Sequence, residues 1–197
     1  MSSVTAAPDA WRVHVADSLT GLEVAELRGA RRIADLGSGA GFPGLVLAVA
    51  LPDAAVDLIE SVGRKCEFMR RTIEAAGIAN ANVVNARSEE LAEGDARDSY
   101  DAVTARAVGR LSTLAELAAP LLRENGTLVA WKGKRDQDEE EQLQRAVEQL
   151  AMAPERILDV GDRAGSKHRH LHVIRKSGPT PADLPRRPGM AKKRPRG

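Results

Sequence analysis

A chain of 197 residues with 43% hydrophobic content can build one domain with a proper core and short appendages. It contains no apolar stretch of signal-peptide or membrane-span length, which argues against secretion and membrane insertion and predicts a cytoplasmic protein. The single cysteine, Cys66, excludes an internal disulfide framework and agrees with a reducing compartment.

The net charge of +1 conceals an uneven distribution. Residues 163–197 hold eleven of the 29 basic residues and one of the 28 acidic residues, so residues 1–162 carry 18 basic and 27 acidic groups, a net charge of −9. An acidic body with a basic end favours a polyanionic partner bound in a salt-dependent way. The alternative is a solvated tail that only aids solubility.

Strand and helix patterns alternate along most of the chain. Residues 11–27 form a candidate amphipathic helix, and the patterns that follow are typical of a doubly wound, mostly parallel sheet with helices on both faces. Beyond residue 176, proline and basic residues dominate, which predicts a disordered tail. We therefore expect an N-terminal helical segment (1–28), a main α/β domain (29–176) and the tail (177–197). The predicted strands are 32–36, 55–60, 82–85, 100–105, 126–132, 156–160 and 170–175, and the predicted helices between them are 44–50, 64–76, 111–122 and 137–152.

A glycine-rich loop follows the first predicted strand. Its residues 37–44 include four glycines, a pattern that lets a backbone approach a nucleotide and then begin a helix. The spacing Gly39-x-Gly41-x-x-Gly44 also fits the dinucleotide fingerprint. Asp35, just before the loop, favours a cationic ligand such as S-adenosylmethionine (SAM) over a pyrophosphate, although Asp35 could instead hold the turn structurally.

Polar residues also end the next three predicted strands. Glu60 is a candidate for the ribose hydroxyls of an adenosine, in SAM or NAD alike. Ser88 and Glu89 could bracket an adenine ring, or Ser88 could be a helix N-cap. Arg106 could meet a ligand carboxylate, RNA or Glu89, or be an ordinary surface arginine.

Several sequence blocks are specific when taken together, and they span residues 12–176. With these blocks the chain resembles the bacterial 16S rRNA guanine-N7 methyltransferases (the RsmG or GidB family). The blocks begin at His14, Asp35, Glu60, Arg87, Arg106, Lys132 and His170, and the glycine loop ends in Gly-Phe-Pro-Gly. The resemblance implies a Rossmann-like class I methyltransferase fold with a seven-stranded sheet, SAM as methyl donor, and a guanine in the 530 loop of 16S rRNA as acceptor.

The resemblance also completes the set of candidate site residues. The cofactor candidates are Asp35, Gly37, Gly39, Phe42, Glu60, Ser61, Ser88, Glu89 and Arg106, and the RNA candidates are Lys65, Trp131, Lys132, Arg169 and His170. Trp131 and Phe42 enter as stacking candidates because the chain has only five aromatic residues. Val13 replaces an arginine usual in the family, and few residues precede His14, which suggests a minimal or shortened form.

No catalytic base and no metal site are predicted. Guanine N7 carries a lone pair and no proton, so positioning alone can provide much of the acceleration. The histidines at 168, 170 and 172 lack a third ligand at a recognisable spacing. We expect a monomer acting on 16S rRNA or the 30S subunit, without a protein partner or membrane contact. The alternatives are a non-catalytic rRNA-binding or assembly factor and an NAD-dependent oxidoreductase, for which no hydride-transfer dyad is visible.

Overall fold

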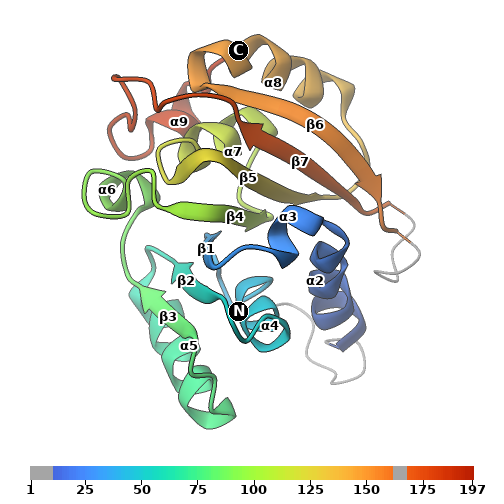
Figure 1. The fold of residues 1–197 in the computed structure, drawn as a ribbon, viewed down its shortest axis with the longest axis vertical. Coiled ribbons are helices and arrows are strands. Elements are labelled where there is room, and N and C mark those ends of the chain that lie inside the picture. The colour runs from blue at the N-terminus through green and yellow to red at the C-terminus, as the bar shows by residue number, and fades with distance from the viewer. Residues whose placement is uncertain (1–10, 162–167) are drawn as a thin grey trace.

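The computed structural model describes residues 11–161 and 168–197, without the side chains of Trp11 and Arg12. The chain forms one twisted sheet with helices on both faces (Figure 1). None of the described helices combines the length and hydrophobicity that a membrane span requires.

The N-terminal elements are η1 (Trp11–Ala16), α2 (Asp17–Leu19), η2 (Thr20–Glu23) and α3 (Ala25–Arg28). The later helices are α4 (Gly44–Ala50), α5 (Gly63–Ala76), α6 (Ser88–Leu91), α7 (Leu111–Ala118), α8 (Gln137–Leu150) and α9 (Met190–Lys193). The strands are β1 (Arg32–Leu36), β2 (Ala55–Ile59), β3 (Ala81–Val84), β4 (Tyr100–Arg106), β5 (Leu122–Lys132), β6 (Met152–Asp159) and β7 (His170–Lys176).

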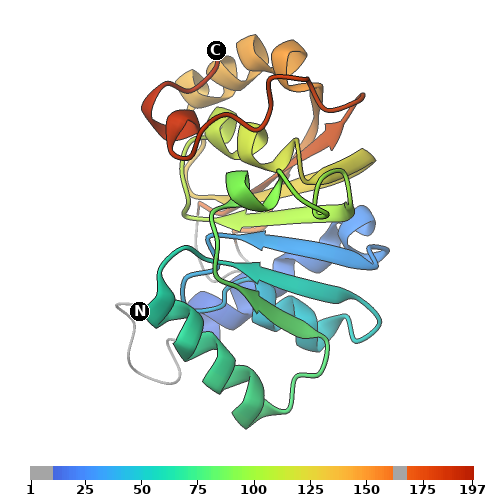
Figure 2. The same cartoon turned by 90° about the vertical axis from the view of Figure 1, so that its left-hand side faces the viewer.

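The seven strands lie in the order β3-β2-β1-β4-β5-β7-β6. Strands β1 to β5 pair in parallel, whereas β7 runs antiparallel to both β5 and β6. The seven-stranded, mostly parallel sheet predicted from the sequence is therefore confirmed. Because β1 lies between β2 and β4, the chain order reverses beside β1, and such a switch point is where open α/β sheets bind ligands. In Figure 2 the arrowheads of β1 to β4 point to the same edge of the sheet.

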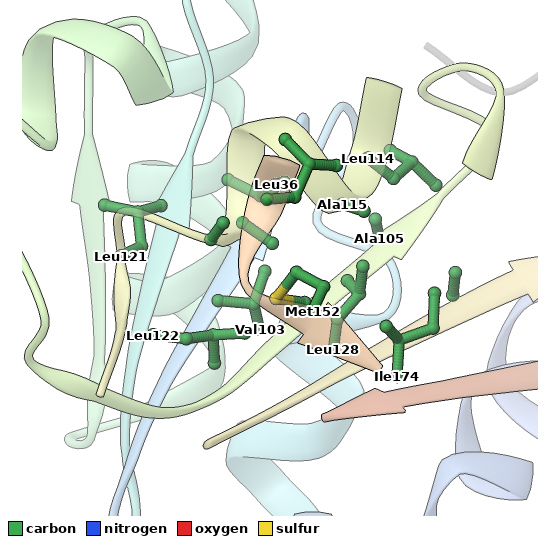
Figure 3. Packing of buried hydrophobic residues seen from close by; sticks show 14 of the residues in the cluster. Leu36, Val103, Ala105, Leu114, Ala115, Leu121, Leu122, Leu128, Met152 and Ile174 are labelled. Carbon is green, nitrogen blue, oxygen red and sulfur yellow. The ribbon is translucent and has the colours of Figure 1, made fainter. Parts of the chain in front are cut away.

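The sheet separates two apolar clusters. One cluster lies under α7 and α8 and includes Leu36, Val103, Leu114 and Leu128 (Figure 3). The other packs α3, α4 and α5 against the opposite face of the sheet and includes Leu58 of β2, which is fully buried. Burying both faces explains why the central strands read as almost continuous apolar runs.

Three predicted helices have different limits in the structure. The predicted helix 111–122 ends at Ala118, because Pro120 has no N–H to continue it, and β5 already begins at Leu122. The predicted helix 137–152 ends at Leu150, where Ala151 adopts a left-handed conformation and its N–H caps the last turn. The predicted N-terminal helix 11–27 is helical from Trp11 to Glu23, as consecutive segments of different helix type, and the extended residue Val24 separates this stretch from α3.

The predicted disorder of residues 177–197 is wrong. This segment, here called the C-terminal strap, packs back over the domain with Leu184 and Ala191 at most 3% exposed. Its Arg186 forms a two-pronged ion pair with the buried Glu116, at 2.5 and 2.6 Å. Composition failed here because the basic residues that suggested a solvated tail include partners for acidic groups on the body of the protein.

Candidate functional site

The glycine loop leaves β1 in a conformation that only glycine adopts readily. Gly37 has φ +64° and its N–H donates to the carbonyl of Ile59 at 2.9 Å, which joins the loop to the end of β2. A Cβ at Gly37 would lie 2.8 Å from Cγ2 of Val108. The loop therefore needs glycine here both for its backbone angle and for its close approach to the chain after β4.

Asp35 holds this loop from behind. It is fully buried, with one carboxylate oxygen accepting the Thr104 hydroxyl (2.8 Å) and the other accepting the Gly44 N–H (3.2 Å). It does not line the pocket described below. The structural alternative raised from the sequence therefore fits Asp35, and attraction of a cationic ligand by direct contact does not.

The burial of Asp35 gives a testable pH dependence. Burial raises the pKa of Asp35 to about 6, whereas an unfolded Asp has a pKa of about 3.9. The stability contributed by the protonated form is therefore complete below about pH 4 and is lost as the pH rises through 6. We expect the free energy of unfolding of Asp35→Asn, relative to the unaltered protein, to rise by about 2 kcal/mol between pH 4 and 6.5.

Urea denaturation of both proteins across this pH range measures the difference. The comparison is needed because His172 acts in the opposite direction: burial lowers its pKa to about 4, so its contribution is lost as the pH falls. A difference between the two proteins that does not change with pH would contradict the account of Asp35.

Glu60 follows β2 and is fixed by the chain around it. Its carboxylate accepts hydrogen bonds from the N–H groups of Val62 (2.9 Å) and Gly39 (3.2 Å) and forms an ion pair with the Lys65 ammonium (3.3 Å). Only 6% of the residue is exposed, yet it lines a pocket at the carboxyl edge of the sheet. Such a fixed carboxylate is suited to accept the two hydroxyls of a ribose.

Ser88 and Glu89 begin α6 and reach the same pocket. The Ser88 hydroxyl donates to one oxygen of Glu89 at 3.1 Å, and the N–H of Gly189 donates to the other at 2.8 Å. Ser88 is the first residue of α6 and not its N-cap, which is Arg87, so that alternative from the sequence is wrong. The Glu89 carboxylate is thus fixed on both sides.

The pocket brings five of the nine predicted cofactor residues together. Its volume is about 180 Å³, and these five residues are Gly37, Glu60, Ser61, Ser88 and Glu89. Gly39 instead lines a neighbouring groove with Lys65 and Phe68 of α5. The sequence missed Val108, Thr113 and the strap residues Gly189, Ala191 and Lys192, which also line the pocket. Nothing local in the sequence shows that the strap returns to this edge.

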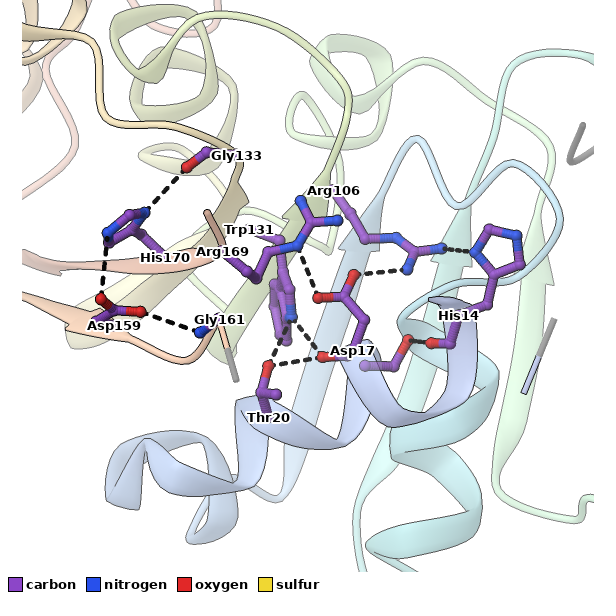
Figure 4. Close-up of polar contacts among 11 residues, drawn as sticks. His14, Asp17, Thr20, Arg106, Trp131, Gly133, Asp159, Gly161, Arg169 and His170 are labelled. Carbon is purple, nitrogen blue, oxygen red and sulfur yellow. Dashed lines mark hydrogen bonds and ion pairs between the residues drawn. The ribbon is translucent and has the colours of Figure 1, made fainter. Parts of the chain in front are cut away.

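Arg106 and Phe42 belong to a separate group, the arginine cluster (His14, Asp17, Phe42, Arg106 and Arg169). The Asp17 carboxylate, which is 1% exposed, forms ion pairs with the guanidinium groups of Arg106 (2.9 Å) and Arg169 (2.8 Å) (Figure 4). The pair with Arg169 is not aligned as a hydrogen bond. The Arg106 guanidinium lies 5.4 Å from the centre of the Phe42 ring, which stacks on His14 at 4.9 Å. Burial and the charge of Arg106 lower the pKa of His14.

The pairing register places this cluster beside the glycine loop. Leu36 pairs with Ala105, so Gly37 and Arg106 leave adjacent strands together. The pocket and the arginine cluster therefore occupy neighbouring positions at one sheet edge, although Arg106 does not line the pocket.

Two of the five predicted RNA contacts have structural roles in the fold. Trp131 is 2% exposed, and its indole N–H donates to the Asp17 carbonyl (3.0 Å) and the Thr20 hydroxyl (3.2 Å), so its ring cannot stack on a base. The Lys132 ammonium binds the Gly109 carbonyl (2.9 Å) and Glu139 (2.6 Å), which ties β5 to α8. The stacking prediction for Trp131 is thereby corrected.

The other three RNA candidates lie in different surroundings. Lys65 pairs with Glu60 and is partly exposed, Arg169 belongs to the arginine cluster, and His170 contacts the Gly133 carbonyl at 3.0 Å and faces Asp159 at 3.9 Å. Among residues 11–161 and 168–197, no group of three or more His, Cys, Asp and Glu side chains has the arrangement of a metal site. Lys167, part of the basic end of the sequence, lies outside the described residues.

Comparison with solved structures identifies the fold. A SAM-dependent methyltransferase from Aquifex aeolicus matches 85% of this chain and 93% of its own with a TM-score of 0.64 at 17% identity. A SAM-dependent O-methyltransferase from Thermotoga maritima matches 90% of this chain and 68% of its own with a TM-score of 0.64 at 15% identity. The fold is that of the class I SAM-dependent methyltransferases.

Sequence comparison narrows this class to one family. The model of the GidB family, described as rRNA small subunit methyltransferase G, matches residues 1–171. The ribosomal RNA small subunit methyltransferase G of Rubrobacter xylanophilus is 42% identical over 186 residues, which are 92% of this chain and 71% of the relative. The protein of the same name from Bacillus subtilis is 34% identical over 196 residues, 99% of this chain and 82% of the relative. The chain belongs to the rRNA small subunit methyltransferase G family.

Proposed function

We propose that the protein transfers a methyl group from SAM to N7 of a guanine in the 530 loop of 16S rRNA. The observation that carries the proposal is the convergence of Gly37, Glu60 and Ser88–Glu89 on one pocket in a member of this family. Membership of a methyltransferase family argues against the two alternative functions, an NAD-dependent oxidoreductase and a non-catalytic assembly factor. The proposal includes a monomer that acts in the cytoplasm on free 16S rRNA or on the 30S subunit.

The chemistry of the pocket fits this donor. Glu60 and Glu89 offer carboxylate oxygens, which accept hydrogen bonds from ribose hydroxyls and from an amino group, and Gly37 keeps its side of the pocket clear of a side chain. When bound, SAM supplies a methyl on a sulfonium; the S–CH₃ bond breaks as the bond to guanine N7 forms, and S-adenosylhomocysteine leaves. The protein's residues need to hold the donor and the base in line and to exclude other nucleophiles.

The arginine cluster is the face that we assign to the RNA. Arg106 and Arg169 share the single carboxylate of Asp17, so this part of the surface keeps positive charge beside the glycine loop. Phe42, which stacks on His14 and lies near Arg106, is half-buried, and its ring is the stacking candidate that remains after Trp131. No residue is needed to take a proton, because N7 of guanine has none to lose.

Methyl incorporation tests the proposal. The protein is incubated with SAM labelled in its methyl group and with 16S rRNA or 30S subunits from a strain lacking this modification. We expect incorporation into one of the two substrates, at a guanine of the 530 loop whose N7-methylation makes the RNA cleavable by aniline after reduction. Failure to label either RNA would refute the proposed reaction.

A further inference from the structure

The C-terminal strap is anchored along its length to the main domain. The Arg97 guanidinium donates to the Leu184 carbonyl at 2.8 Å, and the Thr113 hydroxyl donates to the Ala191 carbonyl at 3.3 Å. Between these points, Arg186 forms an ion pair with Glu116, whose side chain is only 2% exposed. A solvated tail that only aids solubility would not be expected to bury its residues or to pair them with the domain in this way.

These contacts hold the strap against the pocket. Gly189, Ala191 and Lys192 line it together with Glu60, Ser88 and Glu89. The Gly189 N–H donates to Glu89 at 2.8 Å. The strap therefore positions one carboxylate oxygen of Glu89, a candidate cofactor-binding residue. The strap lies beyond residue 171, where the match to the family model ends.

We infer that residues 189–192 of the strap form a wall of the SAM pocket at its adenosine end and hold Glu89 in position for binding. The inference rests on the cofactor assignment of the proposed function. The strap faces Ser88 and Glu89, the residues assigned to the adenine, and Glu89 has its two oxygens fixed by Ser88 and Gly189. A bound adenosine therefore gains both a covered pocket and an oriented carboxylate from this segment.

A matched pair of glycines separates this role from a general effect on folding. Gly189 has φ +82° and Gly77, at the far end of α5, has φ +64°, and a Cβ at either position would have no atom within 4 Å. Valine strains the backbone at both positions because it strongly disfavours positive φ. Only Gly189 contacts a pocket residue.

We expect Gly189→Val to weaken SAM binding at least tenfold in isothermal titration calorimetry, while Gly77→Val, with a comparable change in Tm, leaves the Kd unchanged. Methylthioadenosine, which carries the adenosine half alone, should lose the same factor with Gly189→Val. Unchanged or tighter SAM binding by folded Gly189→Val would overturn the inference, and so would a loss confined to SAM.

Hydrogen exchange provides a second test on the unaltered protein. Saturating S-adenosylhomocysteine should slow amide exchange at residues 186–193 as well as at 86–91, because ligand and strap stabilise each other reciprocally. Unchanged exchange in the strap would contradict the inference. Both experiments omit RNA, so failure of methyl transfer to 16S rRNA leaves their reading intact, whereas failure of the unaltered chain to bind SAM would overturn both proposals.

Discussion

Replacing Asp17 by Asn is expected to lower the free energy of unfolding by about 3 kcal/mol, because two guanidinium groups would lose their common carboxylate. Asp17 is 1% exposed, and its two oxygens lie 2.9 Å from Arg106 and 2.8 Å from Arg169. Breaking a buried pair by removing one partner leaves the other charge desolvated, here twice over. We expect a loss at the lower end of the range of about 3 to 5 kcal/mol for a broken buried ion pair, because the side chains of Arg106 and Arg169 are 13% and 23% exposed.

Urea denaturation at neutral pH measures this loss. Asp53→Asn is the matched control, since Asp53 pairs with Arg31 at 3.6 Å with side chains 86% and 74% exposed. Such an exposed pair contributes less than about 0.5 kcal/mol. If Asp17→Asn and Asp53→Asn were equally stable, the arginine cluster would not be the structural link between the N-terminal elements and the sheet.

Replacing Glu60 by Gln is expected to weaken SAM binding by about 2 to 3 kcal/mol, roughly 30- to 150-fold. The carboxylate is oriented by N–H groups of Gly39 and Val62 and by Lys65, so it meets a ligand without first losing freedom. A ribose hydroxyl that donates to a charged oxygen loses most of that hydrogen bond when the acceptor becomes an amide.

Isothermal titration calorimetry with SAM measures the change. Glu67→Gln is the control, because Glu67 is an exposed carboxylate on α5, the helix that follows Glu60. The control should bind SAM with unchanged affinity. Affinity of Glu60→Gln within twofold of the unaltered protein would remove Glu60 from the cofactor site.

The sheet could be predicted closely because its signals are local. Buried parallel strands appear as short apolar runs between helical patterns, and β1 was predicted at 32–36 and observed at Arg32–Leu36. The polar residues at the strand ends were correctly brought to one edge, since parallel strands end on the same side. Glu60 and Ser88–Glu89 therefore meet in the pocket as expected.

The errors concern contacts between residues that are distant in the sequence. Asp35 points behind the loop because the Thr104 hydroxyl and the Gly44 N–H donate hydrogen bonds to its carboxylate. Trp131 is covered by Asp17 and Thr20, more than a hundred residues earlier in the sequence. The strap was predicted to be disordered from its composition, but composition does not show that Arg186 has a buried partner, Glu116, on the main domain. Composition measures the average character of a segment, whereas docking depends on a few specific partners.

A crystal structure of the protein with S-adenosylhomocysteine would locate the cofactor site. We expect the ribose hydroxyls at Glu60 and the adenine beside Ser88 and Glu89, covered by residues 189–192, with the homocysteine half toward the glycine loop. A ligand bound elsewhere, for example in the groove lined by Lys65 and Phe68, would show that this pocket is not the SAM site.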